Sequence, residues 1–323
     1  MAKSYKIDLK KIKEYFLNKN IKIKSIQNFS SDASNKEFKL CASADNKYLL
    51  LSFKNQPSDF KRYINATNAL IKIGIKVPKI IYTLPSNVIV IMQYLPNNNA
   101  VKYLQSKNID SILLQASNYL WKIKKTRVRI KSIRVKSKKA LITSAFWGIN
   151  TYVDNYKNKI NQYELIIKLI QKVLKKNLKN LSSFNPILAH GDYFLDNLIY
   201  HEKKVWVIDH QDLIYDHPYL DIASLVFDSR RIYKKNTVDK VLNNFLKKHP
   251  KKNRNNVLNS IHLVSLARNL RVLGAWVLLH RLGKTKYLKS YRKQTWHQIS
   301  LHLDHLKLYE LRDLLGIVYK KTT

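Results

Sequence analysis

The sequence predicts a two-lobed α+β fold, with a small β-rich N-terminal lobe and a larger α-rich C-terminal lobe. Short strand-like runs dominate the chain up to Gln93, and apolar residues at helical spacing dominate the rest. Two short strand-like runs near residue 200 interrupt the helices. We place the boundary at Tyr94-Leu95-Pro96 and expect lobes at residues 1–95 and 96–323, a length that suffices for a substantial core.

The predicted N-terminal lobe has about five strands and one long helix, preceded by a shorter helix. Clusters of Ser, Asp and Asn separate the strands, and Gly74 followed by Pro78 ends the long helix. In chain order the expected elements are a helix at Asp8–Asn18, strands at Ile21–Phe29, Glu37–Ala42 and Tyr48–Phe53, a helix at Ser58–Ile73, and strands at Lys79–Thr83 and Val88–Gln93.

The predicted C-terminal lobe is mostly helical. Trp276 and Trp296 fall on helical faces, so we expect both side chains in the core. The expected elements are helices at Ser111–Lys124 and Phe146–Leu178, short strands near Leu195–Tyr200 and Val205–Ile208, and helices from Pro218 to the end of the chain.

Charge and composition exclude several classes of protein. The chain has 60 Lys and Arg against 21 Asp and Glu, which gives a formal net charge of +39. Because Lys, Asn and Ile are frequent along the whole chain, we interpret this charge as a compositional bias and expect no dedicated nucleic-acid partner. The single cysteine, Cys41, excludes an intrachain disulfide and a thiolate metal cluster.

The sequence predicts a cytoplasmic protein without membrane insertion. The best apolar run, Val272–Leu279, has eight residues and is too short to span a bilayer. The first sixteen residues carry charges throughout and lack the apolar segment of a signal peptide.

One strongly basic segment, Lys122–Lys139, contains ten Lys and Arg among its eighteen residues and no acid. Charge runs of this kind are usually solvated loops or helix faces. Alternatively, Arg127, Arg129 or Lys131 would lie toward an acceptor site and attract an anionic substrate.

The densest cluster of polar residues in an apolar frame lies between residues 187 and 231. Acids and histidines between apolar residues are costly to bury without partners. Three acids and an asparagine that follow one another around a predicted strand–turn–strand therefore indicate a functional site. The strings are HGDYFLDN from His190 to Asn197, VIDHQD from Val207 to Asp212, and PYLDIASL from Pro218 to Leu225.

Phosphoryl transfer explains this spacing. The attacking hydroxyl needs a carboxylate that orients it and accepts its proton, and Asp192 fits this role. Mg²⁺ needs hard oxygen ligands, which Asn197, in the same loop, and Asp209, at the end of the next strand, would supply. Gly191 would let the backbone turn tightly beside the base.

The same strings resemble the aminoglycoside phosphotransferase and choline kinase superfamily, which implies a bilobal protein-kinase-like fold. The I-D-x-Q-D form is similar to bacterial cell-wall sugar kinases that phosphorylate N-acetylmuramate and N-acetylglucosamine at the anomeric hydroxyl. Ser30–Leu40, Ala267–Tyr291 and Tyr309–Leu315 are also similar to that branch, so the resemblance covers about residues 20–315.

The resemblance implies a role for each matching residue of the catalytic region. Asp192 matches the catalytic base, and Asn197 and Asp209 match the magnesium ligands. His190 and Asp221 match residues that support the catalytic loop. The residues placed where substrate hydroxyls would bind are Gln211 and Asp212.

The nucleotide side departs from the usual kinase pattern. Such kinases cover the phosphates with a Gly-containing hairpin, whereas this chain has no glycine before Gly74 and offers the small residues of Ser30–Ser34 instead. The third strand lacks the phosphate-pairing lysine, and Asn65 stands where its glutamate partner would be. The residues expected to contact the nucleotide are Ser31, Ser34 and Lys54, with Gln93 and Leu95 at the hinge against the adenine.

We therefore predict an ATP- and Mg²⁺-dependent phosphotransferase that moves the γ-phosphate to a hydroxyl of a small-molecule sugar or alcohol, expected to be the anomeric hydroxyl of an N-acetylated amino sugar. The alternatives are another kinase of the aminoglycoside or choline type and a catalytically weak, basic binding module. The chain lacks the His-Asp and Asp-x-His pairs of metal-dependent phosphohydrolases and the D-F-G and A-P-E signatures of protein kinases.

Overall fold

The structure is a computed structural model of the 323-residue chain. It describes residues 9–29, 37–54, 56–96, 99–126, 130, 133–179, 181 and 185–322. The chain forms two compact units: unit 1 is Met1–Lys102, Val128–Ser132 and Asp196–Asp212, and unit 2 is Tyr103–Arg127, Ile133–Leu195 and Leu213–Thr323.

The division into units differs from a single cut of the chain near residue 95. After Leu195 the chain enters unit 1 for the third time, and it leaves it after Asp212, so a long segment from the second predicted lobe belongs to unit 1. The α+β class is confirmed, because an antiparallel sheet occupies the N-terminal region and helices make up most of the larger C-terminal part.

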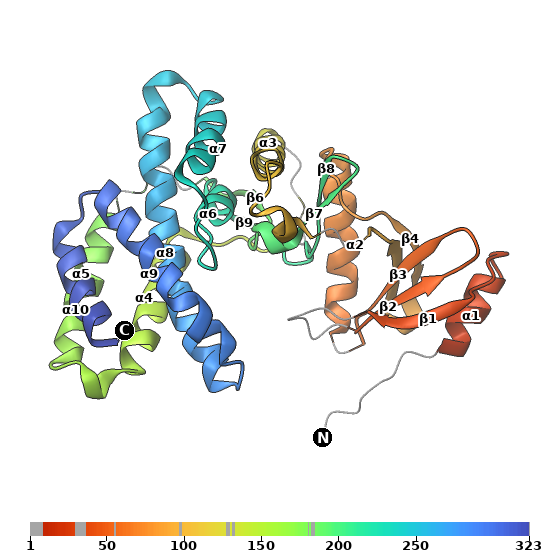
Figure 1. The fold of residues 1–323 in the computed structure, drawn as a ribbon, viewed down its shortest axis with the longest axis horizontal. Helices are drawn as coiled ribbons and strands as arrows, with labels where there is room; N and C mark the ends of the chain where they lie inside the picture. Colours follow the sequence, from red (N-terminus) through yellow and green to blue (C-terminus); the bar gives the residue numbers. More distant parts are fainter. Residues whose placement is uncertain are drawn as a thin grey trace. The chain divides into compact units, whose positions relative to one another are not determined.

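The described residues of the N-terminal region form a five-stranded sheet in which every neighbouring pair is antiparallel (Figure 1). The strand order is β1-β2-β3-β5-β4. The strands are β1 (Ser25–Phe29), β2 (Glu37–Ala42), β3 (Lys47–Ser52), β4 (Ile80–Leu84) and β5 (Ile89–Gln93).

Two helices of unit 1, α1 (Leu9–Leu17) and α2 (Pro57–Lys72), pack on this sheet. Phe16 of α1 lies in one core cluster with Leu50 of β3, and Tyr63 of α2 lies in another with Leu51. Because consecutive strand residues point to opposite faces, the two helices cover opposite faces of the sheet.

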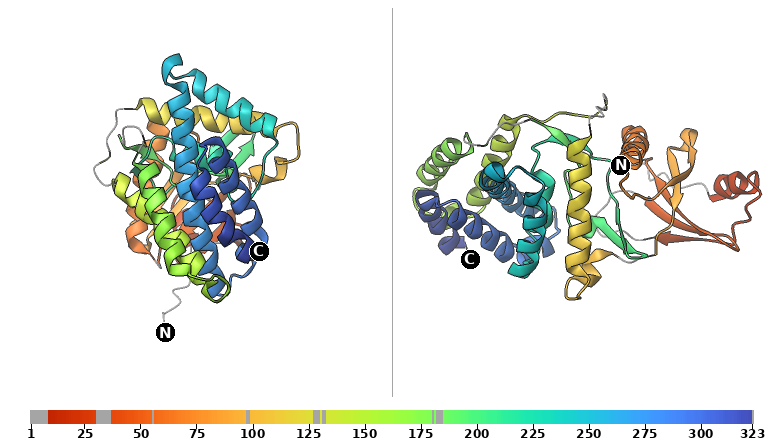
Figure 2. Two further views of the ribbon diagram at one scale, coloured as in Figure 1. Left: turned by 90° about the vertical axis from the view of Figure 1, so that its left-hand side faces the viewer. Right: turned by 90° about the horizontal axis from the view of Figure 1, so that it is seen from above.

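The described part of unit 2 is built around the long helix α8 (Arg254–Arg281), against which α4 and α9 pack (Figure 2). A segment including α8, Lys251–Arg281, is long and apolar enough to cross a membrane, but 78% of its most apolar window is buried inside the fold, as in a core helix. The other helices are α3 (Ile109–Lys125), α4 (Lys138–Asp154), α5 (Tyr163–Leu178), α6 (Leu220–Val226), α7 (Lys235–Lys247), α9 (Lys286–His305) and α10 (Tyr309–Thr322).

Two short antiparallel strand pairs frame the predicted catalytic region. β6 (Ile187–Ala189) pairs with β9 (Ile214–Asp216) in unit 2. β7 (Leu198–His201) pairs with β8 (Lys204–Val207) in unit 1 as a hairpin.

Most predicted elements are confirmed within a few residues, but the single helix over 146–178 is wrong. The structure has α4 and α5 there, separated by a polar stretch in which Gln162 adopts a left-handed backbone with φ 51°. The strands β6 and β9 were not predicted, because three residues are too few to show an alternating pattern. Trp276 and Trp296 are buried, as predicted.

Helices α4 and α8 approach each other closely because each has a glycine at their contact. A Cβ atom added at Gly274 would lie 2.6 Å from the Cα and carbonyl oxygen of Gly148, and one added at Gly148 would clash with the backbone of Leu270 and Arg271. Any larger residue at either position would therefore force the two backbones apart.

We expect Gly274→Ala to lower the free energy of unfolding by about 2–3 kcal/mol, because the added methyl overpacks the contact between two backbones. Gly316→Ala, on α10, is the matched control: apart from its own helix backbone, no atom of the described residues lies within 4 Å of its Cβ position, so the better helix propensity of alanine should raise stability by about 0.5–1 kcal/mol. Urea denaturation of the two variants measures both changes, and equal effects would contradict the close approach.

Three histidines meet between α8 and α9. The Nδ1 atoms of His262 and His302 are 3.0 Å apart, and the ring of His305 stacks on His262 with 3.6 Å between centroids. Burial lowers the pKa of His262 to about 3 and that of His302 well below its usual value. The lowered pKa values keep the buried His262 and His302 neutral at neutral pH, whereas His305 is exposed. Within the described residues, no group of three or more His, Cys, Asp and Glu side chains could hold a metal ion.

Because these buried histidines bind protons less readily in the folded chain than in the unfolded chain, stability should fall as the pH falls from about 6.5 to about 5. The expected slope is up to about 1.4 kcal/mol per pH unit for each such histidine. Denaturation across this range should show a shallower slope for His262→Gln than for the exposed control His297→Gln. Identical slopes would assign the effect to other groups.

Candidate active site

The loop that carries the predicted base begins where β6 ends and is fixed by one buried carboxylate. The Asp221 carboxylate, in the first turn of α6, accepts hydrogen bonds from the backbone N–H of His190 at 2.6 Å and of Gly191 at 3.0 Å. Gly191 has φ 88°, a left-handed conformation that glycine adopts without strain. Two successive amides and the turn between them are thereby fixed next to Asp192.

Burial raises the pKa of Asp221, while the charge of His190 and the two amide donors oppose that rise. A carboxylate in such surroundings is stabilised by the donors that it holds. The same bonds that position the loop therefore also keep this buried side chain satisfied.

The residue after the base is also anchored. The Tyr193 hydroxyl donates a hydrogen bond to the carbonyl oxygen of Ala116 on α3 at 3.0 Å. Burial raises the pKa of Tyr193 well above its usual value, so the hydroxyl stays a donor at neutral pH. Asp192 itself is exposed. The loop thus presents one exposed carboxylate between two anchored neighbours.

In unit 1, the predicted magnesium ligands lie at the open end of the β7–β8 hairpin. The backbone N–H of Ile208 donates to the carbonyl oxygen of Asn197 at 3.0 Å, which places Asn197 beside the residue that precedes Asp209. Asp209 has φ 58°, a conformation that is uncommon outside glycine and that concentrates at functional sites.

The carboxylate of Asp209 is oriented by its neighbour. The side-chain amide of Gln211 donates from Nε2 to Asp209 Oδ1 at 3.0 Å and to Asp212 Oδ2 at 3.1 Å. Gln211 is buried, whereas Asp209 and Asp212 are exposed. The structure therefore brings Asn197, Asp209, Gln211 and Asp212 together within unit 1.

These residues suit a magnesium ion by the chemistry of their donor atoms. Asp209 offers carboxylate oxygens and Asn197 an amide oxygen, and both are hard ligands. Magnesium usually keeps waters and takes substrate phosphate oxygens beside one or two protein ligands, so a small protein donor set is sufficient.

The end of this hairpin is held to α2 and the segment after it by residues that the sequence motifs did not predict. His210 is fully buried; its Nε2 lies 2.7 Å from Thr67 Oγ1, and its ring lies 4.8 Å from that of Tyr63. The backbone N–H of Val207 also donates to the Lys76 carbonyl at 2.8 Å. The only available signal was that a histidine directly follows the predicted metal-binding aspartate.

The remaining predicted residues are spread along unit 1 or lie outside the described residues. Lys54 follows β3 and is half-buried, Gln93 ends β5, and Leu95 is buried just beyond it. Asn65 on α2 is exposed. The residues outside the described part of the chain are Ser31, Ser34, Arg127, Arg129 and Lys131.

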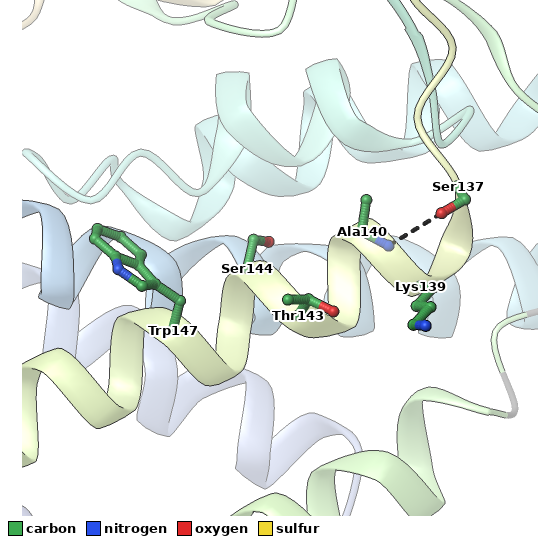
Figure 3. Close-up of a pocket in the computed structure, with 6 residues that line it drawn as sticks. All are labelled: Ser137, Lys139, Ala140, Thr143, Ser144 and Trp147. Atoms are coloured by element: carbon green, nitrogen blue, oxygen red, sulfur yellow. Dashed lines mark hydrogen bonds between the residues drawn. The ribbon is translucent and has the colours of Figure 1, made fainter.

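A shallow open pocket runs along α4 and contains none of the predicted site residues (Figure 3). In the close-up, the indole of Trp147 and the side chains of Thr143 and Ser144 lie along one stretch of the helix. The Ser137 hydroxyl accepts a hydrogen bond from the backbone N–H of Ala140 at 3.2 Å and so begins this helix. Its open shape gives little enclosure for a small molecule.

Comparisons with known proteins agree with the motifs. The sequence model of the phosphotransferase enzyme family matches residues 25–250. An N-acetylmuramate/N-acetylglucosamine kinase of Caulobacter vibrioides is 29% identical over 107 residues, which cover 31% of this chain and 30% of that protein. The chain thus aligns with less than a third of the length of that relative.

Solved structures share the fold at low sequence identity. The choline kinase LicA of Streptococcus pneumoniae has a TM-score of 0.60 and 14% identity, and the match covers 94% of this chain and 100% of that chain. The aminoglycoside phosphotransferase APH(2'')-Ib, with ADP bound, has a TM-score of 0.61 and 17% identity, and the match covers 93% and 98%. These similarities confirm the protein-kinase-like fold.

Asp221→Asn should loosen the catalytic loop, because an amide group replaces a carboxylate that accepts two backbone hydrogen bonds. We expect a loss of about 1–3 kcal/mol in unfolding free energy and faster hydrogen exchange at the amides of His190 and Gly191. The exposed Asp239→Asn on α7 is the matched control and should change neither quantity. Unchanged exchange in the Asp221 variant would contradict the anchoring role.

Proposed function

Since the chain belongs to the phosphotransferase enzyme family, we propose that it is a small-molecule kinase, which transfers the γ-phosphate of ATP to a hydroxyl with the help of Mg²⁺. Residues 1–95 would cover the nucleotide, and residues 96–323 would carry the catalytic loop and the acceptor-binding helices. The observation that carries this proposal is the exposed Asp192 between anchored neighbours, in a loop whose backbone the buried Asp221 holds.

In the proposed reaction, Asp192 orients the acceptor hydroxyl and takes its proton as the new oxygen–phosphorus bond forms. The bond between the γ-phosphorus and the bridging oxygen breaks at the same time, and ADP leaves with that oxygen. Bound Mg²⁺ would neutralise charge on the β and γ phosphates, with oxygen ligands from Asn197 and Asp209. Gln211 would keep the Asp209 carboxylate in one orientation, because it donates to Oδ1.

For the nucleotide, the proposal assigns positioning to residues of unit 1. Gln93 and Leu95 would lie against the adenine, and Lys54, Ser31 and Ser34 would contact phosphates. Lys54 follows β3, and Gln93 is the last residue of β5 in the same sheet. This placement supports a role beside a nucleotide bound along the sheet.

For the acceptor, we propose the anomeric hydroxyl of an N-acetylated amino sugar. The similarity to the Caulobacter kinase supports this choice, because that protein is named for N-acetylmuramate and N-acetylglucosamine. Gln211 and Asp212 would hydrogen-bond sugar hydroxyls. A coupled assay of nucleotide consumption over N-acetylmuramate, N-acetylglucosamine, other hexoses, choline and kanamycin tests the choice, and consumption with choline or kanamycin alone would overturn it.

Asp192→Asn should abolish turnover and leave nucleotide binding intact, because the amide can still accept a hydrogen bond but cannot take the proton. We expect a loss of at least about a hundredfold in kcat, measured by the coupled assay, with an unchanged Kd for ADP by calorimetry. The control Asp239→Asn, exposed on α7, should keep full activity. Loss of ADP binding together with turnover would instead give Asp192 a structural or metal-binding role.

A further inference from the structure

A group of arginines lies next to the catalytic loop in unit 2, outside the motifs. The guanidinium carbon of Arg230 lies 3.7 Å from the centroid of the Phe194 ring. Phe194 follows Asp192 by two residues, so their Cα atoms are at most about 7–8 Å apart. This stacking places one guanidinium group beside the segment that carries the proposed base.

Arg230 is held from two sides by an ion pair and by stacking. Its Nη1 donates to Asp228 Oδ1 at 3.1 Å, and its guanidinium group also lies 5.8 Å from the ring of Trp276 on α8. Its side chain remains 18% exposed. In the part of the chain that the structure describes, Arg230 donates side-chain hydrogen bonds from Nη1 and none from Nε or Nη2. A fixed guanidinium group therefore has donors left for a ligand.

Positive charge exceeds negative charge around this group. Asp228 is fully buried and shared: Oδ1 accepts from Arg230, and Oδ2 accepts from Arg231 at 2.7 Å. Arg268, which is also buried, donates to Ser229 Oγ at 3.3 Å, and its Nε has no hydrogen-bond partner among the described residues. Asp228 thus pairs with two guanidinium groups, and the negative charges of Asp228 and Asp192 both act on Arg268.

Burial lowers the pKa of Arg268 to about 10, and the negative charges of Asp228 and Asp192 oppose that shift, while Arg271 and Arg230 add to it. At neutral pH the group is still charged. The arginines therefore repel one another, and an anion bound beside Arg230 would relieve that repulsion.

We propose that Arg230 binds a carboxylate carried by the acceptor, so that the enzyme selects an acidic amino sugar over its neutral counterpart. The inference rests on the proposed function of the same site. Arginine pairs with a carboxylate through two parallel N–H···O bonds, and the stacking on Phe194 presents the planar group in one orientation.

Arg230 fits this role better than its neighbours do. The side chain of Arg230 is 18% exposed, whereas that of Arg231 is 10% exposed and Arg268 is almost fully buried. Among these three, Arg230 combines the greatest exposure with stacking next to the loop of the base. Arg231 and Arg268 then contribute by their positive charge, which attracts the carboxylate, and not by direct contact with it.

Two acceptor sugars can be compared to test whether the enzyme recognises the carboxylate. N-acetylmuramate differs from N-acetylglucosamine by a lactyl ether that bears a carboxylate, and the anomeric hydroxyl is the same in both. A site that binds the carboxylate should therefore give the two sugars different KM values and similar kcat values, because the reacting hydroxyl is the same.

The experiment compares kcat/KM for both sugars in the wild-type chain, in Arg230→Gln and Arg230→Lys, and in the control Arg312→Gln. Arg312 forms an exposed ion pair with Asp304 at 2.9 Å and matches the chemistry of the change. We expect the wild-type chain to prefer N-acetylmuramate. Arg230→Gln should lose about tenfold to a hundredfold on that sugar, mostly in KM, and less than about twofold on N-acetylglucosamine.

Arg230→Lys retains the charge without the planar fork and should recover part of the loss. Thermal denaturation checks that the variants fold, since Arg231 still pairs with Asp228 when Arg230 is replaced. Equal losses on both sugars, or equal use of both sugars by the wild-type chain, would overturn the inference and leave the proposed function standing. Failure of the wild-type chain to phosphorylate either sugar would overturn both.

Discussion

The buried carboxylate of Asp221 is the interaction on which the rest of the site depends. It holds two successive backbone amides at the end of β6, and this fixes the turn at Gly191. A base for phosphoryl transfer must meet the hydroxyl in one geometry, because catalysis of this kind comes largely from positioning. A loop anchored at His190 and at Tyr193 leaves the exposed Asp192 little freedom except its own rotamers.

The proposed metal-binding hairpin is held by buried side-chain contacts rather than by a carboxylate. His210 contacts α2 through Thr67 and Tyr63, so the backbone on one side of Asp209 is fixed by buried contacts within unit 1. The left-handed backbone of Asp209 is tolerated because those contacts determine it. The contacts within unit 2 therefore position the proposed base, and the contacts within unit 1 position the proposed metal ligands. The chain passes directly from one unit to the other between Leu195 and Asp196.

Sequence patterns predicted the strands of the five-stranded sheet and of the β7–β8 hairpin, the helices with clear apolar faces and the order of the motif residues, because these depend on local periodicity and spacing. The break between α4 and α5 was missed because Lys, Asn and Ile fill both the helices and the connection between them. The roles of His210 and Arg230 depend on partners far away in the sequence or on the stacking of rings, and no spacing rule encodes such contacts. The run Asp228-Ser229-Arg230-Arg231, just after the last motif, was the available signal.

The most direct test of the central claim is the chemical identity of the phosphorylated product. Phosphorus NMR of a reaction containing the wild-type chain, ATP, Mg²⁺ and an N-acetylated amino sugar follows each phosphate separately. We expect a sugar phosphate signal coupled to the anomeric proton, formed one for one with ADP. Release of inorganic phosphate without a sugar phosphate, or unchanged ATP, would contradict the assignment of Asp192 as the base of a sugar kinase.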